Sequence, residues 1–219
     1  MSKTKNIVIY FGSNLAIEIL SYLKDMNYCD DNYQIYVYEE NKALLKKKEL
    51  KLVYDKVKFL KRKSEFKKLT NLKVLIASGD TIIRFKTYEL LKKEGYKFFK
   101  LIHPLAYIGD QAKISDGCII SPFATVAPFA KIGTNCYLNH YSSAGHHVEL
   151  GHSSIMSPFS KVNGNSKLGK RVFLGTTSSV LASLRLNDDS KVSSNSVLTK
   201  NLKAKSLAHG NPAKQTKIY

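Results

Sequence analysis

From Ile102 onward, an aliphatic or small apolar residue occupies every sixth position of the chain. This period matches neither an α-helix, which repeats about every 3.6 residues, nor an antiparallel strand, which alternates every two. Short strands joined by tight corners around a triangular prism produce it, with the apolar residue pointing inward. The pattern therefore predicts a parallel β-helix over residues 102–219. The residues in phase are Ile102, Ile108, Ile114, Ile120, Val126, Ile132, Leu138, Ala144, Leu150, Met156, Val162, Leu168, Leu174, Val180, Leu186, Val192 and Leu198.

Small residues form a second column, four positions after most of these apolar residues, from Ala106 to Ser196. If three hexads complete one coil, residues 18 apart lie one above the other on neighbouring coils, about 4.8 Å apart. Cys118 and Cys136 form such a pair in the inward small column, where we expect inert buried thiols. His146 and Gly164 form a second pair, on the outer surface near a corner.

The first part of the chain has a different pattern. Apolar strand-like runs alternate with stretches of helical spacing, which favours a small parallel sheet of βαβ units. We therefore expect two domains, a Rossmann-like domain over residues 1–101 and a β-helix over 102–219. The runs are 7–11, 35–38, 73–77 and 96–102 for strands, and 15–23, a Lys-rich region and 81–93 for helices.

Composition narrows the class of protein. The 219 residues are 43% hydrophobic, which excludes a disordered chain, and no apolar run approaches the roughly 20 residues of a membrane span. No secretory signal is visible, so we expect a cytoplasmic protein. Three cysteines without a CxxC pair do not suggest a disulfide framework. The net charge of +18 is spread along the chain without a nucleic-acid reading motif, so it favours small anionic ligands over DNA or RNA.

Several segments narrow the fold further and resemble one family. They are the hexad repeat, the phrase Gly79-Asp80-Thr81-Ile82-Ile83-Arg84, the join Ile102-His103-Pro104, the stretch from Asn139 to His146, and the ending Gly210-Asn211-Pro212-Ala213-Lys214. Together they resemble the bacterial hexapeptide-repeat acyltransferases that include sialic acid O-acetyltransferases and nucleotide-linked amino-sugar N-acetyltransferases. The resemblance implies a left-handed β-helix, acetyl-CoA as co-substrate and a homotrimer.

The stacked pair His146 and Gly164 suits acyl transfer. An imidazole can take a proton from an attacking amine or hydroxyl, and a glycine one coil later can present a backbone N–H to the developing oxyanion. In the family that the chain resembles, a histidine at the position of His146 is the general base, a glycine at that of Gly164 supplies the N–H, and an asparagine at that of Asn139 lines the site.

His147 departs from the family pattern, because a carboxylate usually follows the catalytic histidine and orients its ring. Orientation must then come from elsewhere, with Glu149 or a backbone carbonyl as candidates. Since adjacent side chains on a nearly extended chain point to opposite sides, we expect His147 to point away from His146 and Gly164.

The expected reaction is transfer of an acetyl group from acetyl-CoA to the amino group of a nucleotide-linked amino-deoxy sugar, in bacterial surface-glycan synthesis. Expected substrate residues are Gly12, Ser13, Arg84 and His147, with Gly12 and Ser13 at a helix N-terminus that can hold a phosphate. By resemblance, Asn211, Pro212 and Ala213 lie near the CoA together with Gly164. Outward apolar residues, Phe123, Phe129, Tyr137 and Phe159, favour trimerisation.

Three alternatives remain open. The acceptor can be a hydroxyl, as in a sialic acid or other sugar O-acetyltransferase. His147 and His152 resemble the two-histidine stretch of γ-class carbonic anhydrases, but the third zinc ligand would fall at Gln111, and we therefore expect no metal. A non-catalytic β-helix used for binding is the third alternative.

Overall fold

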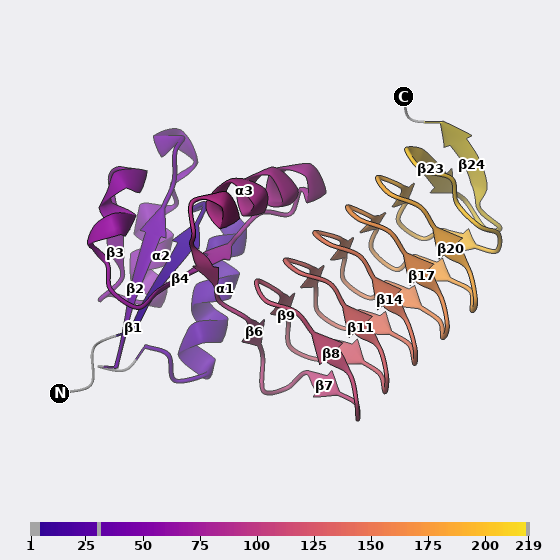
Figure 1. The fold of residues 1–219 in the computed structure, drawn as a ribbon, viewed down its shortest axis with the longest axis horizontal. Coiled ribbons are helices and arrows are strands. Elements are labelled where there is room, and N and C mark those ends of the chain that lie inside the picture. The colour runs from indigo at the N-terminus through magenta and orange to yellow at the C-terminus, as the bar shows by residue number, and fades with distance from the viewer. Residues whose placement is uncertain (1–4, 30–31, 218–219) are drawn as a thin grey trace. The chain divides into compact units, whose positions relative to one another are not determined.

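The computed structural model describes residues 5–29 and 32–217, which form two compact units (Figure 1). The first unit contains the chain up to Gly79 together with Lys86–Phe99, and the second contains Asp80–Phe85 together with the chain from Lys100 onward. The second unit therefore takes in a six-residue piece of the region that the sequence assigned to the first domain.

A parallel five-stranded sheet in the order β3-β2-β1-β4-β5 forms the centre of the first unit. Helical segments connect its strands, as expected for βαβ units. The elements are β1 (Lys5–Tyr10), α1 (Asn14–Asp25), β2 (Tyr33–Tyr38), η1 (Lys42–Leu44), α2 (Lys47–Val53), β3 (Lys58–Leu60), η2 (Lys63–Lys68), β4 (Leu72–Ile76), α3 (Thr81–Lys93) and β5 (Lys97–Phe98).

Alternation along the strands buries both faces of this sheet. Val8 and Tyr10 on β1 pack with Phe66 of η2 and with Leu91 of α3, while Ile7 and Ile9, which point to the opposite face, are also buried. A sheet covered on both faces explains why its strands are nearly continuous apolar runs. The Lys-rich region was expected to be helical throughout, but it also contains the short strand β3, which pairs with β2.

The second unit is a parallel β-helix of two-residue strands that pair at a spacing of 18 residues, as in Val126 with Ala144. Its three walls are the sheets β7 to β22, β8 to β20 and β6 to β24. The first wall contains β7 (Tyr107–Ile108), β10 (Thr125–Val126), β13 (Ser143–Ala144), β16 (Lys161–Val162), β19 (Ser179–Val180) and β22 (Val197–Leu198). The second contains β8 (Lys113–Ile114), β11 (Lys131–Ile132), β14 (Glu149–Leu150), β17 (Lys167–Leu168) and β20 (Arg185–Leu186). The third contains β6 (Leu101–Ile102), β9 (Ile119–Ile120), β12 (Tyr137–Leu138), β15 (Ile155–Met156), β18 (Phe173–Leu174), β21 (Lys191–Val192), β23 (Ser206–His209) and the antiparallel β24 (Lys214–Lys217).

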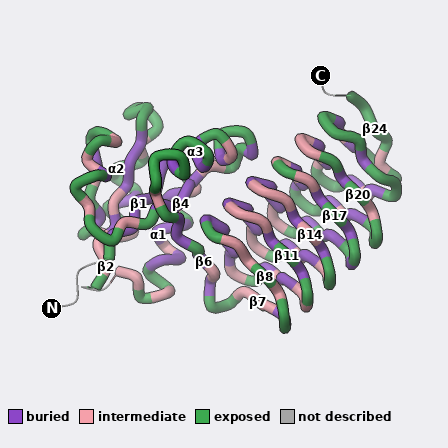
Figure 2. Tube along the Cα trace, viewed as in Figure 1, coloured by how far each residue is buried: buried purple, intermediate pink, exposed green. Residues whose placement is uncertain are grey.

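The interior of this unit is the column of sixth-position residues predicted from the sequence. From Ile120 to Leu198 every one of them is buried, and Figure 2 shows this as regular alternation of buried and exposed positions along the coils. Cys118 and Cys136 lie in the same interior, are fully buried and remain free thiols, as predicted.

Most corners contain one residue with a left-handed backbone, and these residues form three columns. The histidine corner, between the first and second walls, is Gln111, Phe129, His147, Asn165 and Ser183. The arginine corner, between the second and third walls, is Gly117, Asn135, Ser153, Arg171 and Asp189. The aromatic corner, between the third and first walls, is Phe123, Tyr141, Phe159, Thr177 and Asn195.

Candidate active site

His146 and Gly164 meet at the histidine corner, as their 18-residue separation predicts. The His146 ring lies directly against Gly164, in the space that a Cβ atom at Gly164 would occupy. His146 is exposed and Gly164 is buried. Among the described residues, the Gly164 amide has no hydrogen-bond acceptor, whereas those of Asn163 and Asn165 donate to Val180 and to His146. A base and an unpaired amide donor therefore lie side by side, as acyl transfer requires.

The expectation that His147 points away from His146 is wrong. His147 has φ of +58°, so the chain turns at this residue instead of continuing as an extended strand. The Nδ1 atoms of the two rings are 3.3 Å apart, which is within hydrogen-bonding distance. The His147 ring in turn stacks on Phe129, with centroids 4.9 Å apart and an interplanar angle of 17°.

Glu149, one expected source of orientation for His146, is engaged elsewhere. Its carboxylate lies 3.3 Å from the Lys131 ammonium and 3.6 Å from that of Lys167. The hydrogen bond from Lys131, followed by the charge of Lys167, lowers the pKa of this carboxyl. The sequence did not indicate that His147 would provide the contact instead.

Asn139, the third predicted catalytic residue, lies at a different corner. It follows β12 at the aromatic corner, and its side-chain oxygen accepts a hydrogen bond from the His140 amide at 2.7 Å. A strand of the first wall, β13, lies between this corner and the histidine corner that contains His146. The single chain therefore does not bring Asn139 to the base.

In the first unit, Gly12 and Ser13 lie at the carboxyl end of β1, where helix α1 begins. The Gly12 amide donates to the buried carboxylate of Glu39 at 3.0 Å, so this amide is not free for a phosphate. Ser13 is the N-cap residue of α1, and its side chain makes no capping hydrogen bond. Glu39 was not among the predicted site residues, although an acidic residue directly after the second strand is a common ribose ligand in nucleotide-binding folds.

Arg84 was predicted to contact the substrate, but it has no exposed surface. Its guanidinium donates to the backbone oxygen of Asn135 at 3.0 Å and to the Asn135 side chain at 2.9 Å, and it lies over the Tyr137 ring. Burial lowers the pKa of Arg84 to about 10. This geometry makes Arg84 a structural residue of the second unit. Tyr137 was expected to be exposed, but it is buried as well.

The predicted CoA segment follows β23. Asn211 and Pro212 are exposed, and Ala213 packs partly against the interior of the β-helix, with its amide donating to Val197 at 2.8 Å. This segment is therefore fixed to the last coil, with two residues open to solvent.

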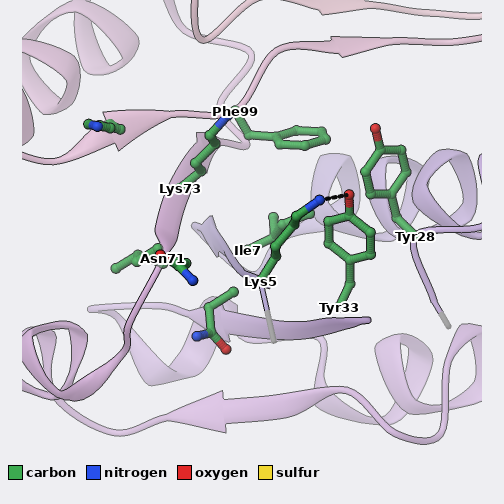
Figure 3. A pocket seen from close by; sticks show the side chains of 10 residues that line it. Lys5, Ile7, Tyr28, Tyr33, Asn71, Lys73 and Phe99 are labelled. Atoms are coloured by element: carbon green, nitrogen blue, oxygen red, sulfur yellow. Dashed lines mark hydrogen bonds between the residues drawn. The ribbon is translucent and has the colours of Figure 1, made fainter. Parts of the chain in front are cut away.

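A cavity of about 260 Å³ adjoins the histidine pair. It is lined by Gln111, Lys113, Phe129, Lys131, His147 and Glu149. A second cavity, of about 590 Å³, opens in the first unit near the N-terminal ends of β1 and β4, with Lys5, Tyr28, Tyr33 and Lys73 in its lining (Figure 3). It contains none of the predicted site residues and lies at the end of β1 opposite to Gly12.

The residues of the zinc alternative are divided between corners. Gln111 and His147 share the histidine corner, whereas His152 lies near the arginine corner, where its Nδ1 is 2.8 Å from the Thr134 carbonyl oxygen. Within residues 5–29 and 32–217, no three His, Cys, Asp or Glu side chains form a group that could hold a metal. No helix of the same ranges is long and apolar enough to cross a membrane.

No protein-family model and no curated protein sequence matches the chain. Solved structures do. A variant of perosamine N-acetyltransferase from Caulobacter crescentus, in complex with CoA and GDP-perosamine, matches over 96% of both chains with a TM-score of 0.82 and 20% identity.

Two further structures match to a similar degree. The acetyltransferase domain of PglB from Neisseria gonorrhoeae matches with a TM-score of 0.83 at 17% identity, and WeeI from Acinetobacter baumannii with 0.83 at 22% identity. Each match covers 97% of this chain and 100% of the other. The chain has the fold of these acetyltransferases. The parallel β-helix expected from the hexad repeat is thereby confirmed.

Proposed function

We propose that this chain is an acetyl-CoA-dependent N-acetyltransferase that acts on the amino group of a nucleotide-linked amino-deoxy sugar in bacterial surface-glycan synthesis. One observation carries the proposal: the His146 ring lies against Gly164 of the next coil, beside an amide without an acceptor among the described residues. The shared fold supports it, since a protein of that fold was solved with CoA and GDP-perosamine.

The mechanism follows from the two groups at the histidine corner. The acceptor amine attacks the thioester carbonyl carbon, and His146 Nε2 takes the proton that the nitrogen loses. The carbonyl oxygen becomes negative and is stabilised by the Gly164 N–H. The carbon–sulfur bond then breaks, and the proton on His146 passes to the CoA thiolate, which restores the free base.

The remaining substrate contacts belong to the same proposal. The first unit is a Rossmann-like domain whose helix α1 offers its N-terminus and Ser13 to the substrate phosphates, with Glu39 as a candidate ribose ligand. The second unit is a left-handed β-helix, and the CoA lies along its later coils near Asn211, Pro212 and Ala213. The enzyme is a homotrimer, and a neighbouring copy supplies the Asn139 that one chain holds away from His146.

A CoA-release assay tests the proposal. With acetyl-CoA and a panel of nucleotide-linked amino sugars, we expect turnover on at least one amine and little on free sialic acid. His146→Ala should lower kcat by roughly 10² to 10⁴-fold, as expected for loss of a general base, with the KM for acetyl-CoA changed by only a few-fold.

His152→Ala is the matched control, because His152 lies near the arginine corner and not at the corners of His146 or Asn139, and it should leave kcat close to that of the wild type. Turnover on sialic acid alone would support an O-acetyltransferase. If the purified protein contained stoichiometric zinc, and a strong chelator removed the zinc and the activity together, a zinc enzyme would be supported instead.

A further inference from the structure

The contact between His146 and His147 determines which ring nitrogen of His146 is free. Their Nδ1 atoms face each other at 3.3 Å. A hydrogen bond between two neutral rings requires one Nδ1 to carry the hydrogen and the other to be bare. The pair therefore has two possible arrangements, and they differ in whether His146 can act as a base.

Only one arrangement leaves His146 able to accept a proton on Nε2. If His147 donated, His146 would use its Nδ1 lone pair as the acceptor, and its Nε2 would already carry the hydrogen. If His146 donates, its Nε2 lone pair is free. This step rests on the proposed function, because it takes His146 as the general base.

We propose that His147 is a positioning residue, a neutral hydrogen-bond acceptor that holds His146 in the Nδ1–H tautomer. It does with an uncharged ring what a carboxylate does in a histidine–carboxylate pair. When the acceptor amine transfers its proton to His146 Nε2, the resulting imidazolium keeps its Nδ1–H bond to His147. The proton then leaves to the thiolate sulfur, and His147 neither gains nor loses a proton.

The surroundings hold His147 in place for this role. Its ring stacks on Phe129 at 4.9 Å, and Gly164 leaves room for the His146 ring beneath it. Three charged side chains, Lys113, Lys131 and Glu149, line the cavity beside His147. The neutral side chain of Gln111 also lines it. The Glu149 carboxylate forms ion pairs with Lys131 and Lys167. The hydrogen-bonding contact of His146 Nδ1 is therefore with the His147 ring.

The chain itself shows which substitutions the backbone at His147 accepts. The left-handed corner position is occupied by Phe129 one coil earlier, by Asn165 one coil later and by Asp189 at the arginine corner, with φ between 59° and 63°. The backbone conformation at residue 147 is therefore one that phenylalanine, asparagine and aspartate residues adopt elsewhere in this β-helix. Their effects report on the hydrogen bond and not on backbone strain.

Two variants of His147 separate the effect of its hydrogen-bond acceptor from the effect of its stacked ring. His147→Phe keeps a ring for stacking on Phe129 but removes the acceptor, and we expect kcat to fall about tenfold, less than for loss of the base itself. His147→Asn offers a side-chain oxygen to the same Nδ1–H and should restore kcat to within about threefold of wild type, the scale of one neutral hydrogen bond. KM for acetyl-CoA should change little in either variant.

The tautomer is measured directly and without substrate. Nitrogen NMR of the ¹⁵N-histidine-labelled full-length protein, assigned with His146→Gln, should show His146 with hydrogen on Nδ1 in the wild type and in His147→Asn. In His147→Phe, the resonances should shift toward the Nε2–H form.

The outcomes separate this inference from the proposed function. A wild-type protein with the expected tautomers but no acetyl transfer to any acceptor contradicts the proposed function alone. An active wild type in which His146 carries its hydrogen on Nε2, or equal kcat for the Asn and Phe variants, overturns the role of His147.

Discussion

A methyl group added at Gly164 and one added at Gly145 would meet different kinds of atom. At Gly164 it would overlap Cε1 and Nε2 of the His146 ring, which can rotate away. At Gly145 it would lie 2.9 Å from the Gly164 nitrogen and 2.9 Å from the Val162 oxygen, which are fixed backbone atoms. The first substitution therefore displaces the base, and the second strains the coil.

We expect Gly164→Ala to lower kcat by about 10²-fold or more, on the scale of removing the base, with little change in melting temperature. Gly145→Ala should instead lower the free energy of unfolding by about 1–3 kcal/mol, the usual cost of overpacking. Urea unfolding of both variants distinguishes the two effects, and steady-state kinetics of Gly164→Ala measures the loss of turnover. If Gly164→Ala kept full activity, the observed ring position would not be the one used in catalysis.

Single residues also show how far the sequence could predict the site. The pairing of His146 with Gly164 was predictable, because an 18-residue coil fixes which residues stack. The contact with His147 was not, because it depends on a left-handed φ that non-glycine residues rarely adopt and that sequence alone does not indicate. Arg84 was misplaced for a related reason: its partner Asn135 is 51 residues away in the chain, and a charged residue near a helix start is ordinarily exposed.

At the scale of elements, the arginine corner contains a close, two-contact ion pair between Arg171 and Asp189. Arg171 Nε and an Asp189 carboxylate oxygen are 2.6 Å apart, a second contact of 2.8 Å joins Nη2 to the other oxygen, and both side chains are mostly buried. The hydrogen bond from Arg171 lowers the pKa of Asp189 below its usual value of 3.8. Because the folded state favours the ionised carboxylate, the stabilisation is present above that value and is lost as the pH falls through the lowered one.

Asp189→Asn should therefore reduce the free energy of unfolding by about 1 kcal/mol at neutral pH, a typical value for a partly buried bidentate pair. The difference from wild type should shrink as the pH falls below about 4, where the unfolded carboxyl is already protonated. Urea unfolding at several pH values measures this. Asp116→Asn is the control, since Asp116 is 71% exposed and 3.7 Å from Lys100, and should have almost no effect. A pH-independent difference would contradict the assigned cause.

Elements also differ in how readily the sequence predicts them. The β-helix strands were predictable because one period of six runs through all of them. The strand β3 was not, because three residues with one lysine inside a Lys-rich stretch show no period of their own. Its position is set by pairing with β2, a tertiary effect that local propensity does not contain.

At the scale of the whole molecule, the aromatic corner presents an exposed ladder of rings. Phe123, Tyr141 and Phe159 stack with centroids 4.9 and 4.8 Å apart, and each side chain remains 47–49% exposed. A contiguous exposed apolar column is typical of an association surface. It lies at the same corner as Asn139, the predicted site residue that one chain cannot bring to His146.

Light scattering at micromolar concentration should therefore give about three chain masses. Tyr141→Lys places a charge in the middle of the ladder and should yield monomers that have lost turnover. Asn195→Lys, at the polar end of the same corner, should remain a trimer with wild-type kcat. A wild-type protein that is monomeric and active would contradict both the assembly and the contribution of Asn139 from another copy.

The strict pairing of residues 18 apart also limits how this protein can change in length during evolution. An insertion of one or two residues within a wall would rotate all later corners relative to the earlier ones and turn interior residues outward. A whole additional coil after Gly164 would leave the His146 site intact, whereas the same coil inserted between His146 and Gly164 would place a different residue beneath the base. Relatives that differ in β-helix length should therefore differ by multiples of one coil, located away from the turn that follows His146.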